Sequence, residues 1–214
     1  FGVIVDDKVK KIDKDFRCSP ISRSSIAGGY ILNSFLIGVI MSVIAFAAGE
    51  IFIVASGGEL LPFESILKVL GMILLAVLSA SSMMFFVVSF FNSTNAYATA
   101  STIIGTLIGF ITGMYLPVGS MPEGVATVVK LFPISHAASI FRKIFMAVPF
   151  EQTFEGVPKE AADTAVNTLR QDLGVDFTIG SWDVSILDSI LILVASAILF
   201  YILGIIVISR KRKV

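Results

Sequence analysis

The stretch VSILDSILILVASAILFYILGIIVI, residues 184–208, decides the fold class. One carboxylate interrupts it, and it exceeds the about 20 apolar residues that a helix needs to cross a hydrocarbon core of roughly 30 Å. Three more apolar stretches lie at residues 26–49, continuing toward Ala55, at 66–91 and at 96–116. Lipid offers no partner for open backbone groups, and these stretches lack the alternation of barrel strands. All four are therefore predicted to be transmembrane helices.

The overall composition also indicates a membrane protein. Hydrophobic residues make up 56% of the 214 residues and charged residues 15%, with a mean hydropathy of +0.92. Soluble domains carry about 25% charged residues. The net charge is zero, so we expect no nucleic acid as a partner. The hydrophobic composition instead predicts the lipid bilayer as a partner. The single cysteine, Cys18, excludes an intrachain disulfide.

The basic residues predict how the chain is oriented. Most of the 16 Lys and Arg lie in two short stretches, one near each end. These stretches contain Lys8, Lys10, Lys11, Lys14, Arg17 and Arg23, and then Arg210, Lys211, Arg212 and Lys213. Cytoplasmic loops are enriched in Lys and Arg, and four spans place both ends on one side. We therefore expect a multi-pass protein of the plasma membrane with both ends of this segment in the cytoplasm.

The predicted fold is all-α: a polytopic transmembrane bundle with a short cytoplasmic helix and an outer re-entrant helical hairpin. Residues 1–25 open on a short apolar run, which predicts the end of a preceding span, and continue into a cytoplasmic segment. Residues 26–116 hold three spans. Residues 117–183 form the outer segment, and residues 184–214 hold the last span and a basic cytoplasmic tail.

The outer segment is predicted to contain helices of its own. Residues 121–131 and 135–148 are moderately apolar, and a Pro precedes each. Both are too short to cross, so we interpret them as re-entrant or interfacial helices. The segment then turns polar, and a short helix is predicted over residues 159–173, ended by Gly174.

A row of small residues marks the third predicted span. Gly105, Gly109 and Gly113 recur at four-residue spacing, and Thr102 extends the row. Such a row lets another helix backbone approach closely in a membrane. Packing within the chain is one interpretation. A dimer seam or the lining of a pathway is the other, and the pattern does not choose between them.

The sequence indicates no catalytic site and no metal site. His136 is the only histidine, and no Cys or His cluster accompanies it. No Ser–His–acid constellation and no phosphate-binding Gly loop can be argued from spacing. Glu50, Lys68 and Asp188 lie near the ends of spans, where we expect them to act as interfacial anchors. Any energy source is therefore expected outside this chain.

The stretch before the first span carries a helix-start signal. Ser19 is a plausible N-cap with Pro20 at the first helical position, so a short helix is predicted to begin there and run into the span. The stretch is either a solvated anchor that only sets topology or a docking surface for a cytosolic partner.

Several motifs resemble one transporter family. SPISR at 19–23 is followed by GGYIL at 28–32, YLPVGSMP at 115–122 leaves the third span, and FPISH at 132–136 precedes FR at 141–142. In this order they resemble the membrane subunit of type-2 ABC transporters, the drug- and polysaccharide-exporter class, over essentially the whole chain. Members usually have six spans, so the resemblance implies that a further pair precedes Phe1.

The resemblance implies roles for three groups of residues. The cytoplasmic coupling helix, which touches the ATPase subunit, would contain Arg17, Ser19, Pro20, Ile21 and Arg23. The third span corresponds to the family's fifth, which borders the dimer seam and substrate path, here Thr102, Gly105, Gly109 and Gly113. The Pro-bounded re-entrant hairpin would contain Pro117, Pro122, Pro133, His136 and Arg142.

The implied function is that of a permease subunit in an ATP-driven exporter of a drug, lipid, peptide or polysaccharide. A second permease copy, identical or different, and a separate ATPase that holds ATP and magnesium would complete the assembly. This chain itself would hold no cofactor and would not be an enzyme. The alternative is a non-transporting scaffold or sensor that binds a ligand or partner through its outer segment. A membrane-embedded enzyme would need clustered catalytic residues at membrane depth, which the sequence does not offer.

Overall fold

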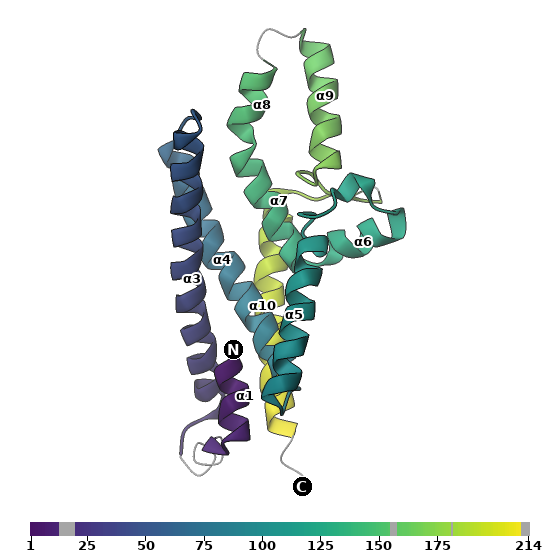
Figure 1. The fold of residues 1–214 in the computed structure, drawn as a ribbon. Coiled ribbons are helices and arrows are strands. Elements are labelled where there is room, and N and C mark those ends of the chain that lie inside the picture. The colour runs from purple at the N-terminus through teal and green to yellow at the C-terminus, as the bar shows by residue number, and fades with distance from the viewer. Residues whose placement is uncertain (13–19, 155–157, 181, 211–214) are drawn as a thin grey trace.

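The computed structural model describes residues 1–12, 20–154, 158–180 and 182–210. The elements are α1 (Gly2–Val9), α3 (Arg23–Ala55), α4 (Phe63–Val88), α5 (Thr94–Ile111), the 3₁₀ helix η1 (Val118–Ser120), α6 (Glu123–Leu131), α7 (Pro133–Phe145), α8 (Ala147–Thr153), α9 (Lys159–Asp172), β1 (Thr178–Ile179), β2 (Trp182–Asp183) and α10 (Ile186–Arg210). Helix α4 packs against α3, α7 and α10, while α5 contacts α1 and α7. Helices α8 and α9 extend beyond the long helices at one end (Figure 1). The predicted all-α bundle is confirmed.

Three helices are long and apolar enough to cross a membrane. They cover Ser24–Ala55, Phe63–Val88 and Ile186–Ile208, which match the first, second and fourth predicted spans. The first span does continue to Ala55, where Gly57 at φ +88° ends the helix. The bent pair α6–α7 passes the same test only when its two helices are taken together. The described residues therefore contain three or four candidate spans.

The predicted extent of the third span, residues 96–116, is wrong. Helix α5 has 18 residues and ends at Ile111, which gives it a length of about 27 Å, slightly less than the roughly 30 Å of a hydrocarbon core. Gly113 adopts φ +70°, and the N–H groups of Gly113 and Met114 bond back to Phe110 and Gly109 at 3.0 and 2.9 Å. This left-handed stop is a glycine C-cap. Gly113 therefore ends the helix and does not extend its small-residue face.

Proline begins each piece of the predicted re-entrant hairpin. Pro117 precedes η1, Pro122 precedes α6, and Pro133 is the first residue of α7. Proline fits these positions because its missing N–H would be unpaired there in any case. Helices α6 and α7 meet at a bend of 88°. The two short helices predicted from the sequence are confirmed.

The helix that leads into the first span begins later than the predicted start at Pro20. Helix α3 starts at Arg23, and Ser22 is its N-cap, accepting a hydrogen bond from the N–H of Ser25 at 3.1 Å. Pro20 and Ile21 lie outside the helix, so a start at Pro20 is wrong. Ser19 lies outside the described residues. Ser22 caps the helix because its hydroxyl accepts a hydrogen bond from one of the N–H groups that the first helical turn leaves unpaired.

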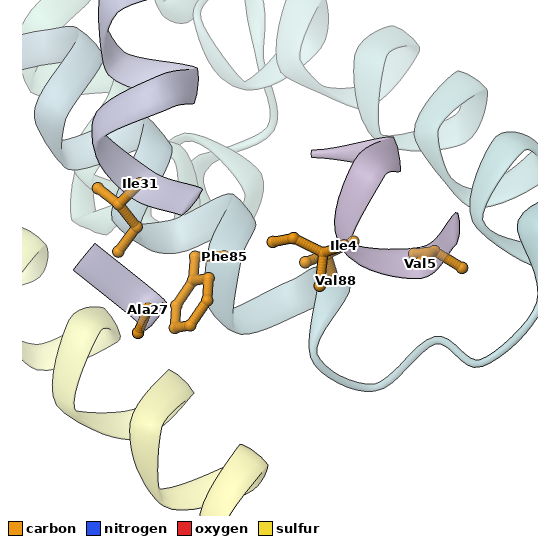
Figure 2. Packing of buried hydrophobic residues seen from close by; sticks show 6 residues of the cluster. All are labelled: Ile4, Val5, Ala27, Ile31, Phe85 and Val88. Carbon is orange, nitrogen blue, oxygen red and sulfur yellow. The ribbon is translucent and has the colours of Figure 1, made fainter. Parts of the chain in front are cut away.

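One cluster of buried apolar side chains joins five helices, α1, α3, α4, α5 and α10, at one end of the bundle. Its buried members come from α1, α3 and α4 (Figure 2): Ile4, Val5, Ala27, Ile31, Phe85 and Val88. Ile205 and Ile208 from the end of α10 pack against it. The start of the described chain and the end of α10 therefore lie at the same end of the bundle (Figure 1).

Polar contacts add to the packing between α4 and α10. The hydroxyls of Ser79 and Ser196 lie 2.8 Å apart and are both buried, and Ser196 also donates to the carbonyl of Leu193. Helix α10 begins with a capping box, in which Asp188 accepts from Ser185 and Ser185 accepts from the N–H of Asp188. These bonds fix the start of α10 and its position along α4.

Candidate functional site

Three consecutive charged residues of α1 bond three different long helices. Asp6 accepts a hydrogen bond from Thr94 at the start of α5 (3.0 Å). Asp7 accepts one from the Tyr30 hydroxyl of α3 (2.6 Å). Lys8 donates to carbonyls at the end of α4, those of Ser89 and Phe91 at 3.1 Å and Val88 at 3.4 Å. We call Asp6, Asp7 and Lys8 the α1 hub.

The signs of the hub charges match the helix ends that they touch. A helix N-terminus carries a partial positive charge and its C-terminus a partial negative one. The carboxylate of Asp6 meets the N-terminus of α5, and the ammonium of Lys8 meets the C-terminus of α4. Both contacts are charge-assisted, which makes them stronger than neutral hydrogen bonds. Helix α1 is therefore attached to α4 and α5 by electrostatics as well as by packing.

The predicted coupling residues lie between α1 and α3 in the chain, up to the first residue of α3. Pro20 and Ile21 are exposed, and Ile21 lines a groove of about 410 Å³ with Asp7 and Tyr30. The backbone of Arg23 begins α3, but its side chain lies outside the described part of the structure, as do Arg17 and Ser19. Among the described coupling residues, Ile21 thus lies next to the α1 hub.

The small-residue row of α5 divides into two different environments. Gly105 has no heavy atom within 4 Å of a Cβ placed on it, so its face is open in the single chain. Gly109 is buried, and a Cβ there would overlap the ring of Tyr115. Thr102 is exposed and donates to the carbonyl of Ala98. Gly109 therefore packs within the chain, while the part of the row at Thr102 and Gly105 is uncovered.

Helix α7 closes the end of α5 with its polar face. Arg142 donates from Nη2 to the carbonyls of Thr112 (2.7 Å) and Gly113 (3.0 Å). Ser135 donates to the carbonyl of Ile111 at 2.8 Å. These are carbonyls that a helix end leaves unpaired, and a cation is favourable there. The predicted hairpin residue Arg142 is thus a cap on α5, the helix that carries the small-residue row.

The same face of α7 also attaches to α10 and to the outer segment. His136 is buried, and its Nδ1 lies 3.2 Å from the hydroxyl of Ser189 on α10. Its ring meets that of Phe177 edge to face at 5.6 Å. Ser139 donates to the carbonyl of Val175 at 2.7 Å. His136 therefore links α7 to α10 and to the outer segment.

A groove runs between α5 and α7. It has a volume of about 470 Å³, and Gly105, Gly109, Thr112, Tyr115 and Arg142 are among its lining residues. A second pocket of about 260 Å³ shares Thr112 with it and reaches α4 and α10. Both volumes are close to the range of small-molecule sites, about 300–1,000 Å³.

An ion cluster in the outer segment holds α9 against α7. Asp176 pairs with Arg170 at 2.6 Å and with Lys143 at 3.0 Å. Burial alone would raise the pKa of the Asp176 carboxyl, but the hydrogen bonds from Arg170 and Lys143 outweigh it, so the pKa lies below its ordinary value. Gly174 at φ +67° ends α9, as predicted.

Replacing Asp176 with Asn is expected to lower stability by at most about 1 kcal/mol at pH 7, because the pairs are partly exposed. A lowered pKa contributes stability above the unfolded-state pKa of about 4, and this is lost as pH falls through the native pKa. Thermal unfolding at pH 7 and pH 3 checks this, with Asp163→Asn on the exposed face of α9 as control. A stability loss that is equal at both pH values would contradict it.

The three ionisable residues near span ends differ in their surroundings. Glu50 is buried and accepts a hydrogen bond from the N–H of Leu61 at 3.2 Å, which ties α3 to the following loop. Lys68 pairs with Glu64 one turn earlier on α4, and both are exposed. Asp188 caps α10. Among the described residues, no group of three or more His, Cys, Asp and Glu side chains could hold a metal ion.

These features define a multi-pass helical membrane protein with polar ties at one end and a capped, glycine-bearing helix beside a groove. The family model for the ABC-2 family transporter protein matches residues 2–206, and the chain belongs to this family. It is therefore a membrane component of an ABC transporter, a permease type of subunit, and not the ATPase. No curated protein and no solved structure gives a significant match.

Proposed function

We propose that the chain is the permease subunit of an ATP-driven exporter in the plasma membrane. It would move a drug, lipid, peptide or polysaccharide when coupled to a separate ATPase that binds ATP and magnesium. The α1 hub is the observation that supports this most, because it links the segment beside the predicted coupling residues to α3, α4 and α5. Both ends of the segment would face the cytoplasm.

The hub offers a route for force from the ATPase to the spans. Closure of the ATPase subunits would displace the coupling segment and α1 with it. The charge-assisted bonds of Asp6, Asp7 and Lys8 would then carry α5, α3 and α4 along as rigid elements. Such a change needs two arrangements of the helices whose balance the nucleotide shifts.

The groove between α5 and α7 is the proposed substrate path. The open face at Thr102 and Gly105 would meet a second permease copy, identical or different, since small residues allow close helix contact. Substrate would then pass between the copies, beside the end of α5 that Arg142 caps.

Co-purification tests the assignment. The full-length protein, expressed in its own host and extracted in mild detergent, is expected to bring an ATPase subunit with it. Candidate compounds from the four substrate classes would be screened for stimulation of ATP hydrolysis, and then for ATP-dependent uptake into inverted vesicles. A protein that binds such compounds, yet purifies without an ATPase and gives no ATP-dependent uptake, would instead be a scaffold or sensor.

Charge reversal of Arg17 and Arg23 to Glu is expected to uncouple ATP hydrolysis from transport. Reversed charges would repel the ATPase surface that the basic side chains contact, and like-charge contacts cost several kcal/mol at interfaces. The measurement is uptake per ATP hydrolysed at matched expression. The control reverses Lys159 on α9, outside the coupling segment. Unchanged uptake in the Arg17 and Arg23 variants would exclude the docking role.

A further inference from the structure

A second groove opens between α4, α7 and α10 and shares no lining residue with the groove beside α5. Its volume is about 550 Å³, within the range of sites that hold an organic ligand. Lys68, Met72 and Leu75 line it at helical spacing on one face of α4, Ile140 and Lys143 on α7, and Ile190 on α10. The two long helices α4 and α10 and the hairpin helix α7 therefore form the wall of this groove.

Charged and apolar side chains lie in different parts of this wall. Met72 and Leu75 lie further along α4 than Lys68, toward the middle of the bundle. Helix α4 begins at the end from which α8 and α9 extend (Figure 1). Lysines near the end of a span place the ammonium group at headgroup level. The groove thus has two lysine ammonium groups at its opening and apolar side chains further inside.

The cations keep a net positive charge despite their partners. Lys143 pairs with Asp176, which also pairs with Arg170, so one carboxylate serves two cations. Lys68 pairs with Glu64, but the side chains of this pair are 58% and 80% exposed, and exposed pairs exchange partners at little cost. An anion at the mouth would gain both ammonium groups without leaving Asp176 unpaired.

We propose that this groove binds an anionic phospholipid, with its phosphate between Lys68 and Lys143 and an acyl chain along Met72, Leu75 and Ile190. Basic pockets between transmembrane helices suit anionic headgroups. The apolar floor selects a lipid over a free phosphate, which would leave the floor uncovered. This site does not depend on the proposed transport function.

Native mass spectrometry of the full-length protein tests the proposal. Dioleoyl phosphatidylglycerol and dioleoyl phosphatidylcholine, which share their acyl chains, would be titrated at equal concentration. Phosphatidylglycerol is expected to be retained preferentially. Lys68→Gln and Lys143→Gln are each expected to lower this preference about fivefold, while Lys159→Gln on α9 leaves it unchanged.

A blocking variant separates the groove from the charges. Gly71 lines the groove, and a Cβ there meets no heavy atom within 4 Å. Gly71→Leu should therefore fold, keep both lysines and lose retention of both lipids. Gly49→Leu on α3 is the matched control, since a Cβ at Gly49 is equally free.

Two results would overturn the proposal. The first is equal retention of the two lipids by the unaltered protein. The second is a folded Gly71→Leu variant that still retains phosphatidylglycerol. If the second result is accompanied by a change in oligomeric mass, the groove holds a second copy of the chain and no lipid.

Discussion

Replacing Lys8 with Met is expected to lower transport about tenfold or more while ATP hydrolysis by the complex continues. The ammonium group of Lys8 bonds the carbonyls of Ser89 and Phe91 at the end of α4. Hydrogen bonds to charged groups contribute about 1.5–3 kcal/mol, and 1.4 kcal/mol corresponds to a factor of ten in an equilibrium. Met keeps the apolar stem in its packing place, so α1 stays folded but no longer pulls on α4. Uptake per ATP hydrolysed is the measurement.

Two further variants sharpen this test. Lys8→Arg keeps a cation at the end of α4 and is expected to retain most of the transport. Lys10→Met removes a lysine from an exposed position beside α1 and is expected to have little effect. If Lys8→Met lowers ATP hydrolysis and uptake in equal proportion, the hub does not transmit force and serves assembly alone.

Replacing Arg142 with Ala is expected to destabilise the protein by about 2–3 kcal/mol and to abolish most transport. The guanidinium group pairs with the carbonyls of Thr112 and Gly113, which would lose a charged donor at a part-buried position. Losing a charge-assisted partner of this kind costs about 1.5–3 kcal/mol, and the favourable interaction with the helix dipole is lost as well. Thermal unfolding in detergent measures the stability change.

Arg142→Lys is the graded control for this prediction. Lysine keeps the charge at the end of α5, but its ammonium group stands on a flexible stem, whereas the rigid guanidinium plane holds Nη2 against both carbonyls. We therefore expect a stability between those of the Ala variant and the unaltered protein. A Lys variant as unstable as the Ala variant would favour a packing role for the side chain over capping. Full stability of the Ala variant would show that the cap is dispensable.

Hydropathy was sufficient to predict the long spans but not all of their ends. Helices α4 and α10 follow from apolar runs, because only a helix satisfies the backbone in lipid. In the sequence, Gly113 is as compatible with a small-residue row as with a helix end. Its φ of +70° in the structure identifies it as a helix end. Ser19 was the predicted N-cap, whereas Ser22 is the N-cap of α3 in the structure. The choice of Ser22 depends on its bond to Ser25.

The candidate site was predicted in part. The Pro-bounded hairpin and Arg142 were expected, but the role of Arg142 as a cap on α5 follows from a contact 30 residues away. The α1 hub was not predicted, because the partners of Lys8 lie 81 and 83 residues further along the chain. The only sign of the hub in the sequence is the charged run Asp-Asp-Lys, which directly follows a short apolar run. Its meaning depends on which helix ends the fold brings beside it.

Photo-cross-linking tests most directly whether the ATPase docks beside the α1 hub. A photoreactive amino acid placed at Ile21, which is 50% exposed, would be irradiated in the assembled full-length complex. Leu60, 62% exposed in the loop at the other end of the bundle, is the matched position. Capture of the ATPase subunit is expected from Ile21 and not from Leu60. Capture from Leu60 alone would contradict both the docking site and the orientation of the chain.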